Sequence, residues 1–280
     1  MKQKFFDLNL VETEWKVFSI FATVAGFVLS ILGTPKEFNI WFLIATLIVF
    51  ILIYIIIFFY YRFWCTTVKL KIGKVDLTVK VGDMFNQDGM KVIPMNEYFD
   101  TQVDDIIISQ TSLNGLYVNK YSGFNNVAKL NEEISKRLKE YPFEKNNERK
   151  NGKQKKYPIG TTIVIDKFIL TALTKFNEIN EAHLSMQEYL NFLNNFWNEI
   201  NRVHNGRVIN VPIMGTGISR INPVLTEQEY LEQIILSLKT STLITSKSKI
   251  NIIVYDGDKS KISLSRLKSV FYNINARKGE

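Results

Sequence analysis

The sequence is poor in the residues that build disulfide frameworks and metal centres. Its 280 residues include one cysteine, Cys65, and two histidines, His183 and His204. A single cysteine excludes an internal disulfide and fits a reducing compartment. A structural zinc site takes about four Cys or His ligands, so the sequence predicts no metal site, and we expect no cofactor.

Charge is nearly absent between residues 15 and 61, where the charged residues are Lys16, Lys36 and Glu37. Two apolar runs, 16–34 and 38–61, each approach the roughly 20 residues that a bilayer-crossing helix needs. The short connector between them leaves room only for a tight turn. After an N-terminal segment, residues 1–14, the sequence therefore predicts a transmembrane helical hairpin over residues 15–62. Buried globular helices are the alternative interpretation.

Basic residues on both sides of the two runs predict the orientation of this hairpin. They are Lys2, Lys4, Lys16, Arg62, Lys69, Lys71 and Lys74. Positive residues concentrate on the cytoplasmic side of membranes, so both termini and the rest of the chain are expected in the cytoplasm. Small residues recur at Ala22, Gly26 and Ser30, a face that suits packing within the hairpin or association between chains.

Patterns typical of strands and helices alternate after residue 66. Residues 67–81 alternate apolar and polar side chains around a turn, which predicts a β-hairpin. Capping boxes at 185–188 and 226–229 each precede an amphipathic helix. The Lys/Asn-rich stretch 143–157 is expected to be a mobile, solvated loop. The alternation predicts an α/β domain over residues 66–280, with a mixed sheet covered by helices on both faces.

The formal net charge of +8 suits an anionic ligand, an anionic membrane surface or nucleic acid. The most basic loop, 143–157, has no interleaved aromatic residues that could stack on bases. We therefore expect no nucleic-acid partner.

Residues 210–222 have the features of a phosphate-binding loop. They follow a short β-branched run and precede a helix, and they contain Gly215-Thr216-Gly217. Glycines let backbone N–H groups converge on an anion because no Cβ blocks the approach. An ordinary strand-to-helix loop is the alternative interpretation, since short glycine motifs are weak signals.

Three separated segments resemble macro domains, which bind ADP-ribose and related compounds. Gly82-Asp83-Met84 resembles the opening Gly-Asp-Ile, and Pro158-Ile-Gly160 resembles a Pro-x-Gly turn before a strand. Residues 212–218 resemble the Pro-x-x-Ser-Thr-Gly-Ile phosphate loop, with Gly215 in place of Ser. The resemblance covers about residues 75–275 and implies that Asp83 receives the adenine amino group and that Asn96 touches the distal ribose.

The whole chain is similar to the transmembrane–macro effectors of type II Thoeris antiphage systems. The similarity rests on the two apolar runs and on the motifs at 82–85, 94–101, 112–115, 157–161, 182–184 and 215–222. The similarity implies a receptor in the bacterial inner membrane. It also implies a partner TIR-domain enzyme, whose signal is an ADP-ribose derivative conjugated to histidine. Binding of this signal would drive homo-oligomerisation and disruption of the lipid bilayer.

Candidate ligand-binding residues follow from these resemblances. They are Asp83, Met84, Asn96, Tyr98, Phe99, Asp100, Thr101, Leu113, Gly215, Thr216, Gly217, Ile218, Ser219, Arg220 and Asn222. Asp83 is alternatively a turn residue at a strand end. Tyr98 and Phe99 suit either stacking on the ligand or core packing. Arg220 suits the carboxylate of a conjugated amino acid or a solvated position.

Residues 97–101 favour a receptor over an enzyme. Hydrolysing macro domains carry glycines after the Asn, whereas this chain has Tyr98 and Phe99 there. We therefore expect no catalytic residue. The alternatives are a membrane-bound ADP-ribosyl hydrolase, which could use Asp100, Asp104 or Asp105, and an ADP-ribose reader without pore activity.

Overall fold

The computed structural model describes residues 15, 18–20, 22–23, 40–60, 64–216, 221–222, 225–245, 247–267 and 270–271. The chain divides into two compact units. One comprises Met1–Val68 together with Ser260–Glu280, and the other comprises Lys69–Lys259.

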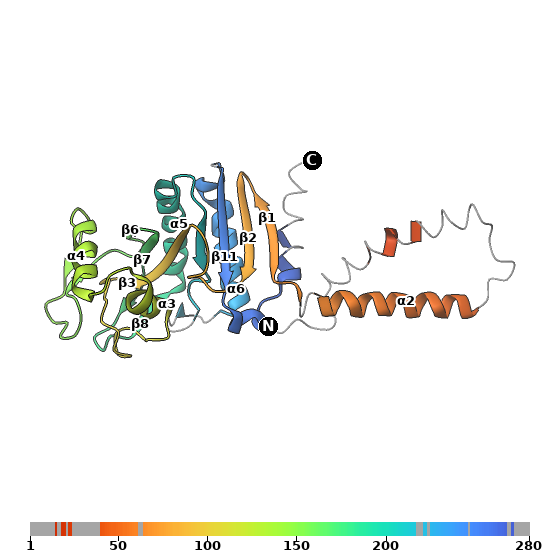
Figure 1. The fold of residues 1–280 in the computed structure, drawn as a ribbon, viewed down its shortest axis with the longest axis horizontal. Coiled ribbons are helices and arrows are strands. Elements are labelled where there is room, and N and C mark those ends of the chain that lie inside the picture. The colour runs from red at the N-terminus through yellow and green to blue at the C-terminus, as the bar shows by residue number, and fades with distance from the viewer. Residues whose placement is uncertain are drawn as a thin grey trace. The chain divides into compact units, whose positions relative to one another are not determined.

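The helix α2, Ile40–Phe59, is the main described element of the first unit (Figure 1). The ring of Phe50 on this helix meets the ring of Phe18 edge-on, with centroids 5.0 Å apart. Of the first predicted span, 16–34, the structure describes only 18–20 and 22–23, so Gly26 and Ser30 lie outside the described residues. Within the portions of the chain that the structure describes, no helix combines the length and the apolar character needed to cross a membrane.

A nine-stranded sheet organises the rest of the described chain, in the order β1-β2-β11-β9-β3-β7-β8-β10 with β6 also paired to β7. The strands are β1 Thr67–Ile72, β2 Val75–Val81, β3 Met90–Asn96, β6 Thr162–Ile165, β7 Phe168–Phe176, β8 Ala182–Ser185, β9 Ile209–Pro212, β10 Ile221–Asn222 and β11 Ser248–Val254. Strands β1 and β2 match the predicted hairpin and alternate buried and exposed residues.

Five neighbouring strands of this sheet, β2, β11, β9, β3 and β7, run parallel to one another. Ile252 of β11, for example, aligns with Val79 on one side and Val211 on the other. Strands β6 and β8 run antiparallel to β7. The predicted mixed α/β sheet is confirmed, and the carboxyl ends of five parallel strands meet at one edge.

Two long helices follow the predicted capping boxes. In α5, Met186–Val203, Ser185 accepts a hydrogen bond from the backbone of Glu188, whose side chain accepts one in return. Thr226 and Glu229 cap α6, Glu227–Thr240, in the same way. The remaining helical elements are α3 Leu113–Leu116, η2 Tyr117–Tyr121, α4 Val127–Arg137, η3 Thr242–Thr245 and η4 Asp256–Lys261. The apolar faces of α5 and α6 are buried, as an amphipathic pattern predicts.

Most residues of the stretch 143–157 are exposed, as its composition predicts, but the stretch is not irregular throughout. It forms a hairpin of β4, Glu144–Lys145, and β5, Lys155–Lys156. The composition did not predict that Arg149, between the two strands, is buried. Its guanidinium lies 3.8 Å from the centre of the Tyr98 ring and 2.8 Å from Asp100 Oδ2.

Removal of the Arg149 side chain should be strongly destabilising. Arg149→Ala would leave the Asp100 carboxylate buried without its ion-pair partner, which costs about 3–5 kcal/mol of unfolding free energy. Urea denaturation of the full chain, followed by tryptophan fluorescence, measures the loss. Lys150→Ala is the matched control, because Lys150 is exposed and surface changes stay within about 0.5 kcal/mol. Equal stabilities of the two variants would contradict this account.

Candidate functional site

A cavity of about 540 Å³ lies at the carboxyl edge of the parallel strands. Each of the five strands contributes residues at or just after its end, and the segment 107–116 forms a further wall. The contributions from the strands are Gly82, Asp83, Met84, Phe85, Pro94, Met95, Asn96, Leu173, Thr174, Phe176, Pro212, Ile213, Met214, Gly215, Thr216, Ile253, Tyr255 and Asp258, with Ala182 from β8. Clefts at this edge of α/β sheets are where ligands bind.

Asp83 and Tyr255 lie at the ends of neighbouring strands. The backbone N–H of Gly82 donates to the carbonyl of Val254, N to O 2.9 Å. Asp83 is exposed, and its Oδ1 accepts a hydrogen bond from the backbone of Phe85 at 2.8 Å. This turn fixes the carboxylate at the strand end. Sequence reasoning missed Tyr255, which is 70% exposed beside the cavity; its place directly after an apolar strand was the available signal.

The glycine loop after β9 has its first half in the described structure. Gly215 has φ 97°, and a Cβ there would lie 2.9 Å from the ring of Tyr230 and from Ile221. Only glycine therefore fits this position without movement of the neighbours. The loop is tied to α5, because the hydroxyl of Tyr189 donates to the carbonyl of Met214 at 2.7 Å.

The second half of the predicted phosphate loop cannot be placed. Gly217, Ile218, Ser219 and Arg220 lie outside the described residues. Asn222 lies in β10, aligned with Ser185 of β8.

Asn96 lines the cavity, but its side chain is largely occupied by its own loop. Its Oδ1 accepts hydrogen bonds from the backbone N–H groups of Tyr98 and Asp100, at 3.1 and 3.2 Å. Its Nδ2 donates to Asp100 Oδ2 at 3.1 Å. Both lone pairs of the Asn96 amide oxygen are therefore taken, and one of the two N–H groups of Nδ2 remains for a ligand.

The four residues after Glu97 are buried but do not line the cavity. Tyr98 is covered by Arg149, and the ring of Phe99 packs edge-on against Tyr157 with centroids 5.7 Å apart. Asp100 pairs with Arg149, and the hydroxyl of Thr101 donates to Asn131 at 2.7 Å. The structure therefore does not bring these four predicted residues to the cavity.

Glu97 does not line the cavity but bonds to a residue that does, and the sequence analysis gave it no role. It is buried, and its Oε1 accepts a hydrogen bond from the backbone N–H of Phe176, a cavity residue, at 3.0 Å. Burial raises the pKa of the Glu97 carboxyl, although Phe176 and the lysines nearby oppose the shift. The carboxylate thus holds the end of β7 beside Asn96.

The acidic residues that kept a hydrolase interpretation open are engaged elsewhere. Asp104 accepts hydrogen bonds from the backbone of Ile106 and Ile107, at 3.0 and 2.7 Å. Burial opposes the shift, but these bonds lower the pKa of Asp104. Asp105 accepts two hydrogen bonds from Gln110, each at 2.8 Å. Asp100, Asp104 and Asp105 all lie outside the cavity lining.

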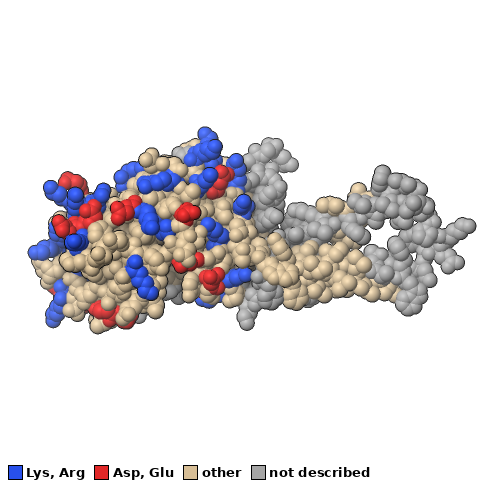
Figure 2. Space-filling model, viewed as in Figure 1, with Lys and Arg blue, Asp and Glu red and all other residues tan. Residues whose placement is uncertain are grey.

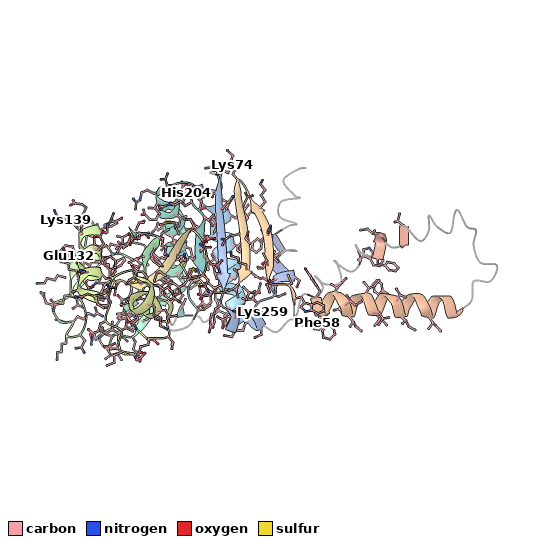
Figure 3. All side chains as sticks on the ribbon, in the orientation of Figure 1. Phe58, Lys74, Glu132, Lys139, His204 and Lys259 are labelled. Carbon is pink, nitrogen blue, oxygen red and sulfur yellow. The ribbon has the colours of Figure 1, made fainter. Side chains whose placement is uncertain are left out.

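The cavity lining contains no Lys, Arg or His in the described part of the chain. The positive charge lies over the outer surface instead, interspersed with Asp and Glu (Figure 2). His204 caps the end of α5, with Nδ1 accepting from the backbone of Gly206 at 3.0 Å (Figure 3). Any anion held in the described part of the site would therefore be bound by backbone N–H groups and neutral side-chain donors.

Comparison with known proteins places this geometry in context. The family model of the Thoeris protein ThsA macro domain matches residues 77–255. The Thoeris protein ThsA of Bacillus amyloliquefaciens (strain Y2) is 34% identical over 206 residues, which are 72% of this chain and 69% of the relative.

Two solved structures of the Oceanobacillus iheyensis macrodomain are also similar. A mutant form aligns with a TM-score of 0.49 and 13% identity, over 75% of this chain and 100% of its own. The macrodomain with ADP aligns with a TM-score of 0.47 and 15% identity, over 74% of this chain and 97% of its own.

Lys153 should make stability depend on pH in the alkaline range. Burial lowers the pKa of its ammonium to about 8, although Asp100 opposes the shift, and its Nζ donates to the carbonyl of Phe99. Between pH 8 and about 10.5 the unfolded chain binds more protons at this group than the folded chain, so its contribution to stability rises with pH. Below pH 8 the contribution is constant.

The measurement compares wild type with Lys153→Met by urea denaturation from pH 7 to pH 10. The difference in unfolding free energy between the two proteins should move in favour of wild type across this window. Lys155→Met, at an exposed lysine of the same hairpin, should track wild type. A pH-independent difference for Lys153→Met would contradict the assignment.

Proposed function

This chain belongs to the Thoeris ThsA macro-domain family, and from that premise we propose that its cavity binds an ADP-ribose-derived nucleotide signal in antiphage defence. The observation that carries the proposal is the order of groups along the cavity edge. Asp83 and Tyr255 lie at β2 and β11, the glycine loop at β9, and Asn96 at β3. A base, a diphosphate and a sugar follow one another in the same order.

The dimensions of the edge support this arrangement. From β2 to β7 there are four strand spacings of about 4.8 Å, or roughly 19 Å. An extended ligand of several linked groups fits such a length, whereas a small metabolite would occupy only one part of it. Residues 107–116 form the cavity wall beside β3, so a group conjugated to the distal sugar would lie against them.

Adenine is the base that the β2–β11 end would take. Asp83 Oδ1 is held by Phe85, which leaves Oδ2 for a donor such as the adenine N6 amino group. The exposed ring of Tyr255 supplies an aromatic face at the neighbouring strand end. The diphosphate would then lie against the backbone of the loop that begins at Ile213, with residues 217–220 completing its cradle.

The protein acts in this proposal as a receptor without catalysis. The engagement of Asp104 and Asp105 with backbone and Gln110 supports it, because a carboxylate that positions water must reach the ligand. The second candidate function is ADP-ribosyl hydrolysis, which would have to use Asp83 or Asp258, the two carboxylates among the described cavity-lining residues. Incubation with ADP-ribosylated protein and measurement of released ADP-ribose distinguishes the two.

The proposal also includes the source of the ligand and the effect of its binding. The ligand would be made by a partner TIR-domain enzyme, as a histidine conjugate of ADP-ribose, and binding would drive assembly of homo-oligomers. Residues 15–62 would associate with the inner membrane with both termini in the cytoplasm, and assembly would disrupt the bilayer. The support is the low charge of this stretch and the exposed apolar side chains of α2, which include Ile48, Leu52 and Ile56.

Asp83→Ala should weaken binding of ADP-ribose by about 1–3 kcal/mol, the scale of a lost hydrogen bond to a charged group. Isothermal titration of the full chain in detergent measures the change. Asp76→Ala is the matched control, since Asp76 is an exposed carboxylate on β2, the strand that precedes Asp83, and lies outside the cavity. Unaltered affinity in Asp83→Ala would remove the adenine end of the proposed site.

The membrane part of the proposal has a separate test. The full chain expressed in bacteria should stay with the membrane pellet after alkaline washing, which strips peripheral proteins. Recovery of the chain in the wash would contradict a membrane-embedded hairpin. This result is independent of ligand binding, so either part of the proposal can fail alone.

A further inference from the structure

Asn114 has a buried polar atom that no protein group satisfies. It lies on α3 and lines the cavity, and its Oδ1 has no hydrogen-bond partner. Of the cavity-lining residues in the described part of the chain, Asn114 is the one with such an atom. A buried amide oxygen without a donor is costly, and a bound donor would relieve the cost.

The position of Asn114 is fixed by its neighbours. Ser112 caps α3, donating to the carbonyl of Ser109 at 2.7 Å and accepting from the backbone of Gly115 at 3.0 Å. Gly115 packs so closely that a Cβ there would lie 2.1 Å from the carbonyl oxygen of Ser109. These contacts hold the backbone of α3 in place at Asn114.

Asn114 lies at the sugar end of the cavity. Helix α3 packs against β3, the strand that ends in Asn96. The adenine amino group would lie at the other end, beside β2, and a diphosphate has no donor at neutral pH. The donors that remain on an ADP-ribose ligand at this end are sugar hydroxyl groups.

Asn96 cannot supply the acceptor for these hydroxyl groups. Both lone pairs of its Oδ1 are taken by the backbone of Tyr98 and Asp100. We propose that Asn114 Oδ1 accepts a hydrogen bond from a hydroxyl of the distal sugar, and that this contact selects ligands carrying that sugar over those ending at the diphosphate. The inference rests on the proposed function and assigns a specificity-determining residue within it.

The test titrates the full chain in detergent with ADP-ribose and with ADP, which lacks the distal sugar. Wild type should bind ADP-ribose more tightly than ADP. Asn114→Leu should weaken ADP-ribose about tenfold and leave ADP unchanged, so that the affinity ratio collapses. Asn114→Asp keeps an acceptor oxygen. Its added charge repels ADP, whose terminal phosphate has one more ionised oxygen, at least as strongly as ADP-ribose, so the preference for ADP-ribose should not fall.

Two controls separate binding from folding. Asn194→Leu makes the same change at an exposed position of α5 and should leave both affinities at the wild-type value. The thermal midpoint of ligand-free Asn114→Leu should equal or exceed that of wild type, because the substitution removes an unsatisfied oxygen.

The outcomes distinguish the inference from its premise. If wild type binds neither nucleotide, the proposed function fails and takes the assignment of Asn114 with it. If wild type prefers ADP-ribose and Asn114→Leu keeps that preference, or weakens both ligands equally, the assignment alone is overturned. A collapsed ratio in Asn114→Asp as well would overturn the role of an acceptor oxygen.

Discussion

The parallel alignment of five strands is the constraint on which the site depends. Parallel pairing in register brings the carboxyl ends of β2, β11, β9, β3 and β7 to one edge. Residues separated by more than 170 positions, such as Asp83 and Tyr255, become neighbours there through the bond between Gly82 and Val254. Each strand then contributes one type of group to the cavity, and the order of the strands fixes the order of the groups.

A buried polar network sets the shape of the loop after Asn96. The Asp100 carboxylate accepts hydrogen bonds from Arg149, Asn96 and the backbone of Lys153. It therefore connects two hairpin residues to Asn96, which lines the cavity. Buried ion pairs contribute little net stability, but they restrict the number of conformations that satisfy every partner. Here the consequence is that Asn96 is held in one orientation, with its oxygen turned to its own backbone.

The net positive charge of the chain is not concentrated in the cavity. The chain carries +8, yet the described cavity lining has only two charged residues, Asp83 and Asp258, both acidic. Positive charge on the outer surface can speed the approach of an anion through its long-range field. Inside the cavity, the discrimination between ligands depends on oriented dipoles, such as backbone N–H groups and the amide of Asn114, which act at hydrogen-bond distance.

The sequence by itself determined the local elements and the family. The β1–β2 hairpin, both capping boxes, the glycine at Gly215 and the macro-domain motifs were all predictable, because each depends on neighbours within a few residues. Tertiary structure decided which side chains reach the cavity. Tyr98 and Phe99 were equally suited to stacking or to the core. Tyr98 is covered by Arg149 and Phe99 packs against Tyr157, both more than forty residues away in the sequence. Tyr255 and Asn114 gained their places from strand order and helix packing, which no local pattern encodes, since contacts between distant segments exist only once the sheet has formed.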